Sequence, residues 1–165
     1  MSKPQLHAAA SQHSGVSYEA SLRATQLEPS VYDRIGSERL LRLSTAFYDR
    51  VFAEADDWFR NIFASSTKQE AIDNQYRFLV QTLGGPPLYR DKKGPYTRLA
   101  GRHATYAIGH AAAETWVGHM QEAMAEVLEE EEDVRDALSD YFRFTAHYIV
   151  VAMEYMRPDQ VRVNG

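Results

Sequence analysis

Apolar side chains recur at intervals of three and four residues along four stretches of this chain. This spacing places them on one face of an α-helix, and it predicts amphipathic helices. The first stripe, Leu40 to Val51, lies in a helix expected from Ser37 to about Phe52. The other stripes are Ile72, Tyr76, Leu79, Val80 and Leu83; then Ala112, Ala113, Trp116, Met120, Ala123, Met124 and Val127; and finally Leu138, Tyr141, Phe142, Thr145, Tyr148, Ile149, Ala152 and Met156. No stretch alternates with period two, so we expect an all-α fold of four main helices with shorter ones.

Local signals mark where several of these helices begin and end. Ser30 followed by Asp33 resembles a capped first turn, and residues 67–70 form a capping box before the second stripe. Gly84 and Gly85 are expected to end that helix, and the two prolines after them oppose its continuation. We therefore expect a long loop, rich in Gly, Pro and Lys, that carries His103 to the edge of the next helix.

The N-terminal residues 1–28 lack a strong apolar stripe. They are rich in Ser, Ala, His and Gln, and we interpret them as an extension that is flexible or forms one short docked helix. His7 and His13 lie six residues apart, do not share a helical face well, and are expected to be solvated. The predicted domain covers residues 29–157, and residues 158–165 form a polar C-terminal tail.

Composition narrows the classes of function. The chain has 165 residues, 44% of them hydrophobic, which suits one domain with a core. Its formal net charge of -5 does not favour nucleic acids or anionic membranes, and no cysteine is present to form disulfides or act as a thiolate. The longest apolar run is far below the ~20 residues that span a bilayer, and no secretory leader is visible, so we expect a cytoplasmic protein without membrane or nucleic-acid partners.

Two polar residues stand out as candidates for chemistry. His103 follows the loop, but a lone histidine is more often a surface or satisfied core residue than a ligand. Gln75 interrupts an apolar helix face one turn before Leu79, and it either points into the interior or reaches water at the boundary. The remaining histidines show no zinc-binding spacing, and Trp116 is expected to be the largest buried anchor of its helix.

Taken in order, these residues resemble the truncated, two-over-two haemoglobins, and specifically the plant-like second group of that family. The resemblance spans most of the domain and departs from the family pattern at Ala104-Thr105-Tyr106 and at Lys93-Gly94-Pro95. The matching residues are the Phe47-Tyr48 pair, Phe63, Gln75 with Leu79, the Leu83-Gly84-Gly85-Pro86 motif, Arg102-His103 and Trp116.

The resemblance implies a truncated globin fold around haem b and a role for each matching residue. His103 would be the axial ligand of the haem iron, while Phe63 and Leu79 would pack on the porphyrin. On the opposite, distal side, a diatomic ligand would accept hydrogen bonds, which the resemblance assigns to Tyr48, Gln75 and Trp116. Arg102 and Tyr89 would contact the haem propionates at the rim of the pocket.

The function implied by this resemblance is the binding of dioxygen, nitric oxide and carbon monoxide. Nitric oxide dioxygenation or peroxide chemistry, supported by an unidentified reductase, fits a small haem protein of this type. An alternative is a haem-based gas or redox sensor that acts on a protein partner through residues 1–28. A haem-free helical interaction protein is a third class, and the sequence allows a homodimer without indicating one.

Overall fold

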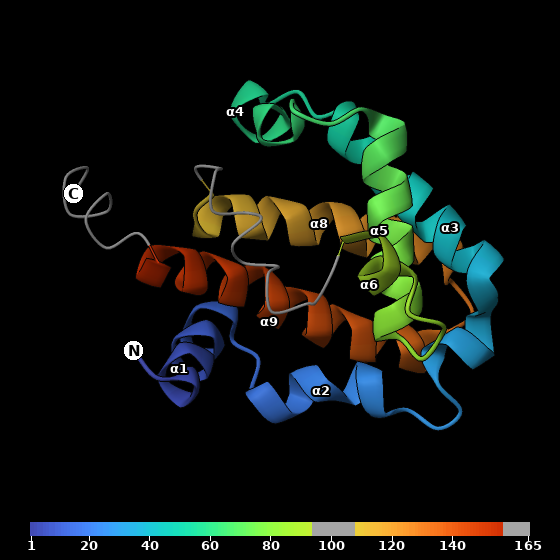
Figure 1. Ribbon diagram of the computed structural model, residues 1–165, viewed down its shortest axis with the longest axis horizontal. Helices are drawn as coiled ribbons and strands as arrows, with labels where there is room; N and C mark the ends of the chain where they lie inside the picture. The colour runs from blue at the N-terminus through green and yellow to red at the C-terminus, as the bar shows by residue number, and fades with distance from the viewer. Residues whose placement is uncertain (94–107, 157–165) are drawn as a thin grey trace.

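The computed structural model describes residues 1–93 and 108–156, and every regular element within them is helical. Figure 1 shows how these helices are arranged. They are α1 (Lys3–Ser14), α2 (Tyr18–Gln26), α3 (Val31–Phe52), α4 (Asp57–Arg60), the 3-10 helix η1 (Asn61–Phe63), α5 (Lys68–Thr82), α6 (Leu88–Lys93), α8 (His110–Val127) and α9 (Glu132–Met156). The all-α fold with four main helices is therefore confirmed, the four being α3, α5, α8 and α9.

The helix caps follow the local sequence signals. The Ser30 hydroxyl accepts a hydrogen bond from the backbone N–H of Asp33 at 3.1 Å, and the Thr67 hydroxyl accepts one from that of Glu70, also at 3.1 Å. Each cap satisfies a backbone donor that has no partner within its helix. The capped turn at Ser30 continues directly into α3, which begins at Val31 and not at Ser37; Gly36, at φ 79°, kinks the helix between the two segments.

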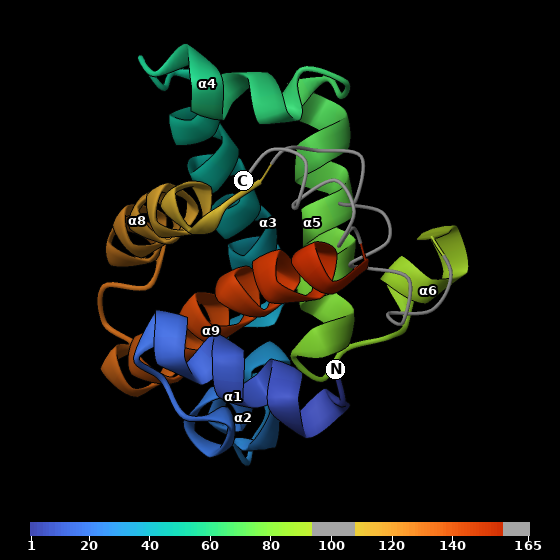
Figure 2. The same cartoon turned by 90° about the vertical axis from the view of Figure 1, so that its left-hand side faces the viewer.

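The four main helices form two pairs that cross each other. Helix α3 packs on α5, α8 packs on α9, and α3 also packs on α8. In Figure 2, α3 and α5 stand upright while α8 and α9 run across them. The two apolar stripes of each pair can therefore be buried against those of the other pair, as a layered helical domain requires.

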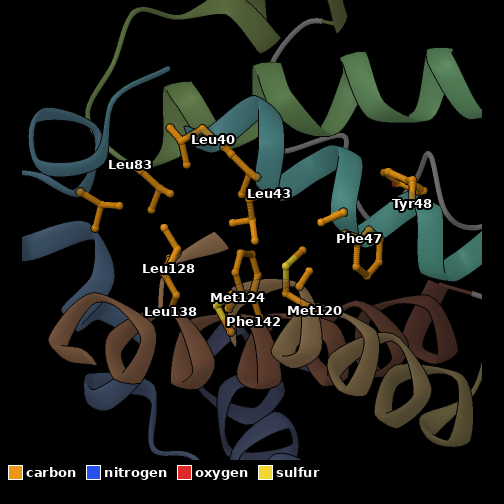
Figure 3. Packing of buried hydrophobic residues seen from close by; sticks show 14 of the residues in the cluster. Leu40, Leu43, Phe47, Tyr48, Leu83, Met120, Met124, Leu128, Leu138 and Phe142 are labelled. Carbon is orange, nitrogen blue, oxygen red and sulfur yellow. The ribbon is translucent and has the colours of Figure 1, made fainter. Parts of the chain in front are cut away.

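The main core lies where α3 faces α8 and α9. Figure 3 shows its buried side chains, each of which contributes about 1.5–3 kcal/mol through burial. The labelled members are Leu40, Leu43, Phe47, Tyr48, Leu83, Met120, Met124, Leu128, Leu138 and Phe142. These residues come from the stripes predicted by the periodicity, with Leu128 added at the end of α8.

The glycine pair after α5 allows two chain segments to approach closely. Gly84 has φ 108°, and a Cβ added there would lie 2.6 Å from the Ser30 Cβ. The backbone N–H of Tyr32 donates to the Leu83 carbonyl at 2.9 Å, so the end of α5 is bonded to the start of α3. Both the left-handed backbone and the missing side chain are needed at this junction.

The N-terminal residues and the loop after Gly85 depart from the expectations. Residues 1–28 are docked, as one alternative allowed, but they form two helices, α1 and α2, which both pack against α9 (Figures 1 and 2). His7 is not solvated, because its ring stacks on Tyr18 with the centroids 3.9 Å apart. The predicted loop after Gly85 contains the short helix α6, which packs on α5.

Candidate functional site

A largely apolar cavity of about 340 Å³ lies between the main helices, the α4–η1 corner and α6. Its volume is within the range of ligand and cofactor pockets. Much of its wall is aromatic, and its described lining contains no charged side chain and no histidine. The lining residues are Tyr48, Phe59, Ile62, Phe63, Ser66, Ala71, Asn74, Gln75, Phe78, Leu79, Tyr89, Ile108, Ala112, Ala113, Trp116, Tyr141, Phe142, Thr145, Ala146 and Ile149.

This cavity brings together most of the residues predicted for the site. They come from five different elements, so only the tertiary fold places them around one space. The predicted residues that line it are Tyr48, Phe63, Gln75, Leu79, Tyr89 and Trp116. The other two, Arg102 and His103, lie outside the residues that the structure describes.

Tyr48 reaches the cavity from the last turns of α3. Its side chain is buried, and its ring packs edge-on against Phe47 and Phe63, with centroids 4.8 and 6.0 Å away. Burial raises the pKa of the Tyr48 hydroxyl far above its ordinary value. The phenol therefore stays protonated and keeps its hydrogen-bond donor at the cavity wall.

Two amide side chains of α5 present polar atoms to the same cavity. The Gln75 Oε1 and Asn74 Oδ1 atoms are buried, and neither has a hydrogen-bond partner among the described residues. A buried polar atom without a partner costs about 1–3 kcal/mol. The oxygen of the half-buried Gln75 amide thus lies in the interior, which agrees with the first of the two alternatives left open by its position in the sequence.

Trp116 lines the cavity from α8 and packs between two core aromatics. Its ring centroid lies 4.8 Å from Phe47 and 5.5 Å from Phe142. The side chain is only partly buried, so Trp116 is not the fully buried anchor expected from the apolar stripe. The largest fully buried side chain of this helix is that of Met120, while the Trp116 indole borders the cavity.

The corner between α3 and α5 is held against α8 by a polar contact. The Glu54 carboxylate and the His119 Nε2 atom lie 2.5 Å apart. The Asp56 backbone N–H, followed by His119, lowers the pKa of Glu54 and keeps its carboxylate charged. Beside this contact, Phe59 packs on Phe63 with centroids 5.4 Å apart, so the corner presents Phe63 to the cavity.

Helix α6 is fixed to α5 by charged side chains at the edge of the cavity. Lys92 Nζ lies 2.5 Å and Arg77 Nε 3.0 Å from the same oxygen of Asp73. The Lys92 hydrogen bond is the main cause of a lowered pKa at Asp73, so the pairing persists at neutral pH. This attachment places the Tyr89 ring over Phe78, edge-on, with centroids 5.4 Å apart.

The sequence reasoning missed several lining residues. Asn74 and Phe78 are one turn apart on α5, next to the stripe of Gln75 and Leu79, so helical spacing could have indicated them. On α9, Thr145 and Ile149 belong to a stripe that we interpreted only as core. A stripe that faces the core and one that faces a cavity have the same pattern, because both avoid water.

None of the helices within residues 1–93 and 108–156 has the length and apolar composition of a membrane span.

Comparison with known proteins adds evidence that is independent of the cavity. The family model described as "Bacterial-like globin" matches residues 30–150, which fall within the predicted domain. The chain is 41% identical over 127 residues to two-on-two hemoglobin-3 of Arabidopsis thaliana, covering 77% of this chain and 72% of that protein. It is 42% identical over 127 residues to group 2 truncated hemoglobin 3-1 of Lotus japonicus, covering 77% and 75% respectively.

Solved structures show the same arrangement of helices. A truncated oxygen-avid haemoglobin from Bacillus subtilis superposes with a TM-score of 0.65 at 35% identity, covering 73% of this chain and 98% of that one. A hemoglobin from Chloroflexus aurantiacus superposes with a TM-score of 0.66 at 32% identity, covering 74% and 98%. Helices α1 and α2 precede the residues that the family model matches.

Proposed function

This chain belongs to the bacterial-like globin family, whose members bind haem, and we propose that its cavity holds haem b with His103 as the axial ligand of the iron. As a globin, it is a haem protein that binds diatomic gases. The roles of individual residues and the reaction performed are proposals that rest on the lining and geometry of this cavity.

The lining of the cavity suits haem. Aromatic and aliphatic walls exclude water from a flat apolar macrocycle, and Phe63 and Leu79 provide such surfaces from two directions. Asn74 and Gln75 also bring side-chain amides to the wall, and an amide N–H can donate to a ligand of the haem iron. The aromatic and apolar lining of the cavity is the observation that carries the proposal.

The histidines support the assignment of His103. The chain has six of them, and the five that the structure describes are absent from the cavity lining. A haem globin needs one axial nitrogen from an imidazole, and His103 is the histidine that remains for that role. Arg102, its neighbour, and Tyr89 are proposed to contact the propionates, Arg102 by charge pairing and Tyr89 by hydrogen bonding.

When bound, haem supplies a ferrous iron that coordinates dioxygen, nitric oxide or carbon monoxide. Hydrogen-bond donors of the protein then determine how tightly a polar ligand is bound. Among the donors at the cavity wall, we assign this role to the Tyr48 hydroxyl, the Trp116 indole N–H and the Gln75 amide N–H. Hydrogen bonds to a charged or strongly polarised acceptor are about twice as strong as neutral ones, so these donors favour dioxygen over carbon monoxide.

We further propose that the protein converts nitric oxide and dioxygen to nitrate. The reaction consumes one molecule of each gas and one electron, so a reductase must supply that electron. The support is a cavity that combines a protonated phenol with apolar walls, since these retain dioxygen and exclude water. Reduction of hydrogen peroxide to water is a second candidate reaction, and it needs two electrons from the reductase and two protons.

A sensor remains the alternative, and one observation favours it. Helix α9 lines the cavity through Thr145, Ala146 and Ile149, while its Phe144 packs in the cluster with α1 and α2. A displacement of α9 at the cavity wall would therefore also move the surface on which residues 1–28 pack. In that case a protein partner would respond to the ligand, and nitric oxide turnover would be slow.

Two measurements test these proposals. Absorption spectra of the purified ferric and ferrous protein, the latter under nitrogen, dioxygen and carbon monoxide, test haem and gas binding; a chain without a Soret band after haem reconstitution would contradict both. Nitric oxide consumption, measured with an electrode in the presence of dioxygen and a general flavin reductase, tests the reaction. Turnover no faster than the uncatalysed control, in a protein that does bind dioxygen, would favour the sensor.

A further inference from the structure

Three histidines from three helices meet on the side of α9 that faces α1. We call His13 of α1, His110 of α8 and His147 of α9 the histidine cluster. The rings of His13 and His110 are stacked, with centroids 3.6 Å apart and planes 11° from parallel. The Nδ1 atoms of His110 and His147 lie 2.8 Å apart, within hydrogen-bond distance. His147 is buried, with 1% of its surface exposed.

The hydrogen bonds determine which nitrogen carries each proton. The Nε2 atom of His147 lies 2.7 Å from a carboxylate oxygen of Glu114, which can only accept, so this nitrogen carries a hydrogen. In neutral His147 the Nδ1 atom is then the acceptor, and His110 must donate from its own Nδ1. The Nε2 atom of His110 is consequently unprotonated, and it is buried without a hydrogen-bond partner among the described residues.

An added proton has no hydrogen-bond partner in the docked state. It would go to the buried Nε2 atom of His110, because the two Nδ1 atoms of the pair already share one proton, and the charged His110 ring would stack against His13. The charged groups that face the pair are Glu114 of α8 and Arg143 and Glu154 of α9, with His13 on the α1 side. Glu154 is the carboxylate nearest the free nitrogen of His110, and it lies 4.0 Å away.

The electrostatics of His110 agree with this geometry. Burial, followed by the nearby His13 and His147, lowers the pKa of His110 to about 4, and Glu114 only partly opposes the shift. His110 is also the first residue of α8, where the helix dipole disfavours a positive charge. Among the described residues no group is arranged to bind a metal, and these rings are stacked and do not point at a common centre.

We propose that the histidine cluster is a pH-sensitive switch that keeps α1 docked on α8 and α9 while the His110–His147 pair is neutral and releases α1 when the pair takes up a proton. Release separates His13 from His110, which lets His110 reach water as a cation. It also uncovers the apolar contact between Ala10 of α1 and Phe144 of α9. Acid would thereby expose a face of the helix whose other residues line the cavity.

The direction of the effect follows from the pKa difference. Released His110 has an ordinary pKa of 6.5, whereas docked His110 has a pKa of about 4. Between these values the released state binds the proton and the docked state does not, so docking weakens as pH falls through this window and is unaffected above it. If the release of α1 is coupled to the uptake of one proton, the equilibrium constant for docking changes by up to about tenfold per pH unit.

Hydrogen–deuterium exchange on the full-length protein tests the switch. The protection of the amides of residues 3–14, corrected for the intrinsic pH dependence of exchange, is measured between pH 7.5 and 4.5. In the wild type we expect protection to fall by roughly tenfold for each pH unit below 6.5. In His110→Asn, whose amide N–H can still donate to His147, most of this dependence should disappear. His119→Asn, on the same helix but bonded to Glu54, should retain the wild-type dependence.

The second histidine of α1, His7, can also contribute to the pH dependence of docking. His7 stacks on Tyr18, and burial, together with Lys3, also lowers its pKa, so it contributes in the same direction. A His7→Asn variant measures that contribution. The proposal is overturned if His110→Asn keeps the wild-type dependence, or if His7→Asn alone removes it.

An NMR titration of the imidazole rings tests the proposal independently of whether α1 still docks in the His110→Asn variant. The wild-type chain is reduced with dithionite and measured under carbon monoxide, so that any haem iron is ferrous and diamagnetic. We expect His110 to be protonated on Nδ1 and His147 on Nε2 at pH 7.5, and the His110 pKa to be well below 6.5. A His110 ring that titrates near 6.5 with α1 still docked would contradict the switch without affecting the assignment of the haem site.

Discussion

The Ser44 hydroxyl of α3 donates a hydrogen bond to the Ile72 carbonyl of α5 at 2.9 Å, at a completely buried position. Ser44 lies one turn before Tyr48, and Ile72 lies one turn before Gln75. This bond therefore connects the two helices that carry the proposed distal donors. It fixes the position of α5 along the axis of α3. The distance between the Tyr48 phenol and the Gln75 amide depends on that position.

Replacing Ser44 by Ala should destabilise the protein by about 0.5–1.5 kcal/mol, the net contribution of one intramolecular hydrogen bond. Urea unfolding followed by circular dichroism measures the loss. The matched control is Thr45→Ala, which removes an exposed bond from the Thr45 hydroxyl to the Leu41 carbonyl within the same helix. Equal losses of unfolding free energy in the two variants would show that the hydrogen bond between α3 and α5 contributes no more to stability than an exposed bond within α3.

His103→Ala should abolish or severely reduce haem retention, because no described histidine lines the cavity to replace it. The intensity of the Soret band after haem reconstitution measures retention, and added imidazole should restore part of it if the variant is folded. His13→Ala, on the far side of α9, serves as the control and should retain haem. An unchanged Soret band and unchanged ligand spectra in His103→Ala would refute the axial assignment.

Removing donors at the cavity wall should speed dioxygen release. A hydrogen bond to a charged group is worth about 1.5–3 kcal/mol, and about 1.4 kcal/mol corresponds to a factor of ten. Tyr48→Phe or Trp116→Phe should therefore increase the dissociation rate by roughly ten- to a hundredfold, with a much smaller effect on carbon monoxide.

Tyr48→Phe combined with Gln75→Leu is the cleaner form of this experiment, because the Gln75 amide lies in the same cavity and can replace a lost donor. Stopped-flow mixing measures the rates. Tyr32→Phe removes a phenol that packs on the core outside the cavity lining, and it should leave the rate unchanged. A double variant that releases dioxygen at the wild-type rate would mean that these side chains only pack.

Deleting residues 1–28 should leave haem binding intact, since every lining residue of the cavity follows Glu28. Stability should nevertheless fall, because α1 and α2 cover α9 and bury Ala10 and Ala24. A loss of about 3 kcal/mol of apolar burial corresponds to a decrease in Tm of roughly 6–12 °C for a chain of this size. Scanning calorimetry measures the Tm, and loss of the cooperative transition would place the N-terminal helices inside the folding unit.

The sequence by itself determined the helices that have strong local signals. Caps at Ser30 and Thr67, the glycines after α5 and the apolar stripes of α3, α5, α8 and α9 act within a few residues of each other. Such signals require no knowledge of the fold, because a helix is held by hydrogen bonds between residues four apart. The resemblance to a known family, carried by residues in a fixed order along the chain, also identified six of the residues that line the cavity.

The tertiary structure decided the features that depend on distant contacts. Helix α1 has little amphipathic character, and its position follows from the face of α9 that it covers. His110 lies 97 residues after His13 and 37 residues before His147, so no local pattern could reveal that the three rings meet. Whether Gln75 faced water or the cavity was likewise settled only by the surrounding helices, because burial belongs to the whole fold and not to the residue.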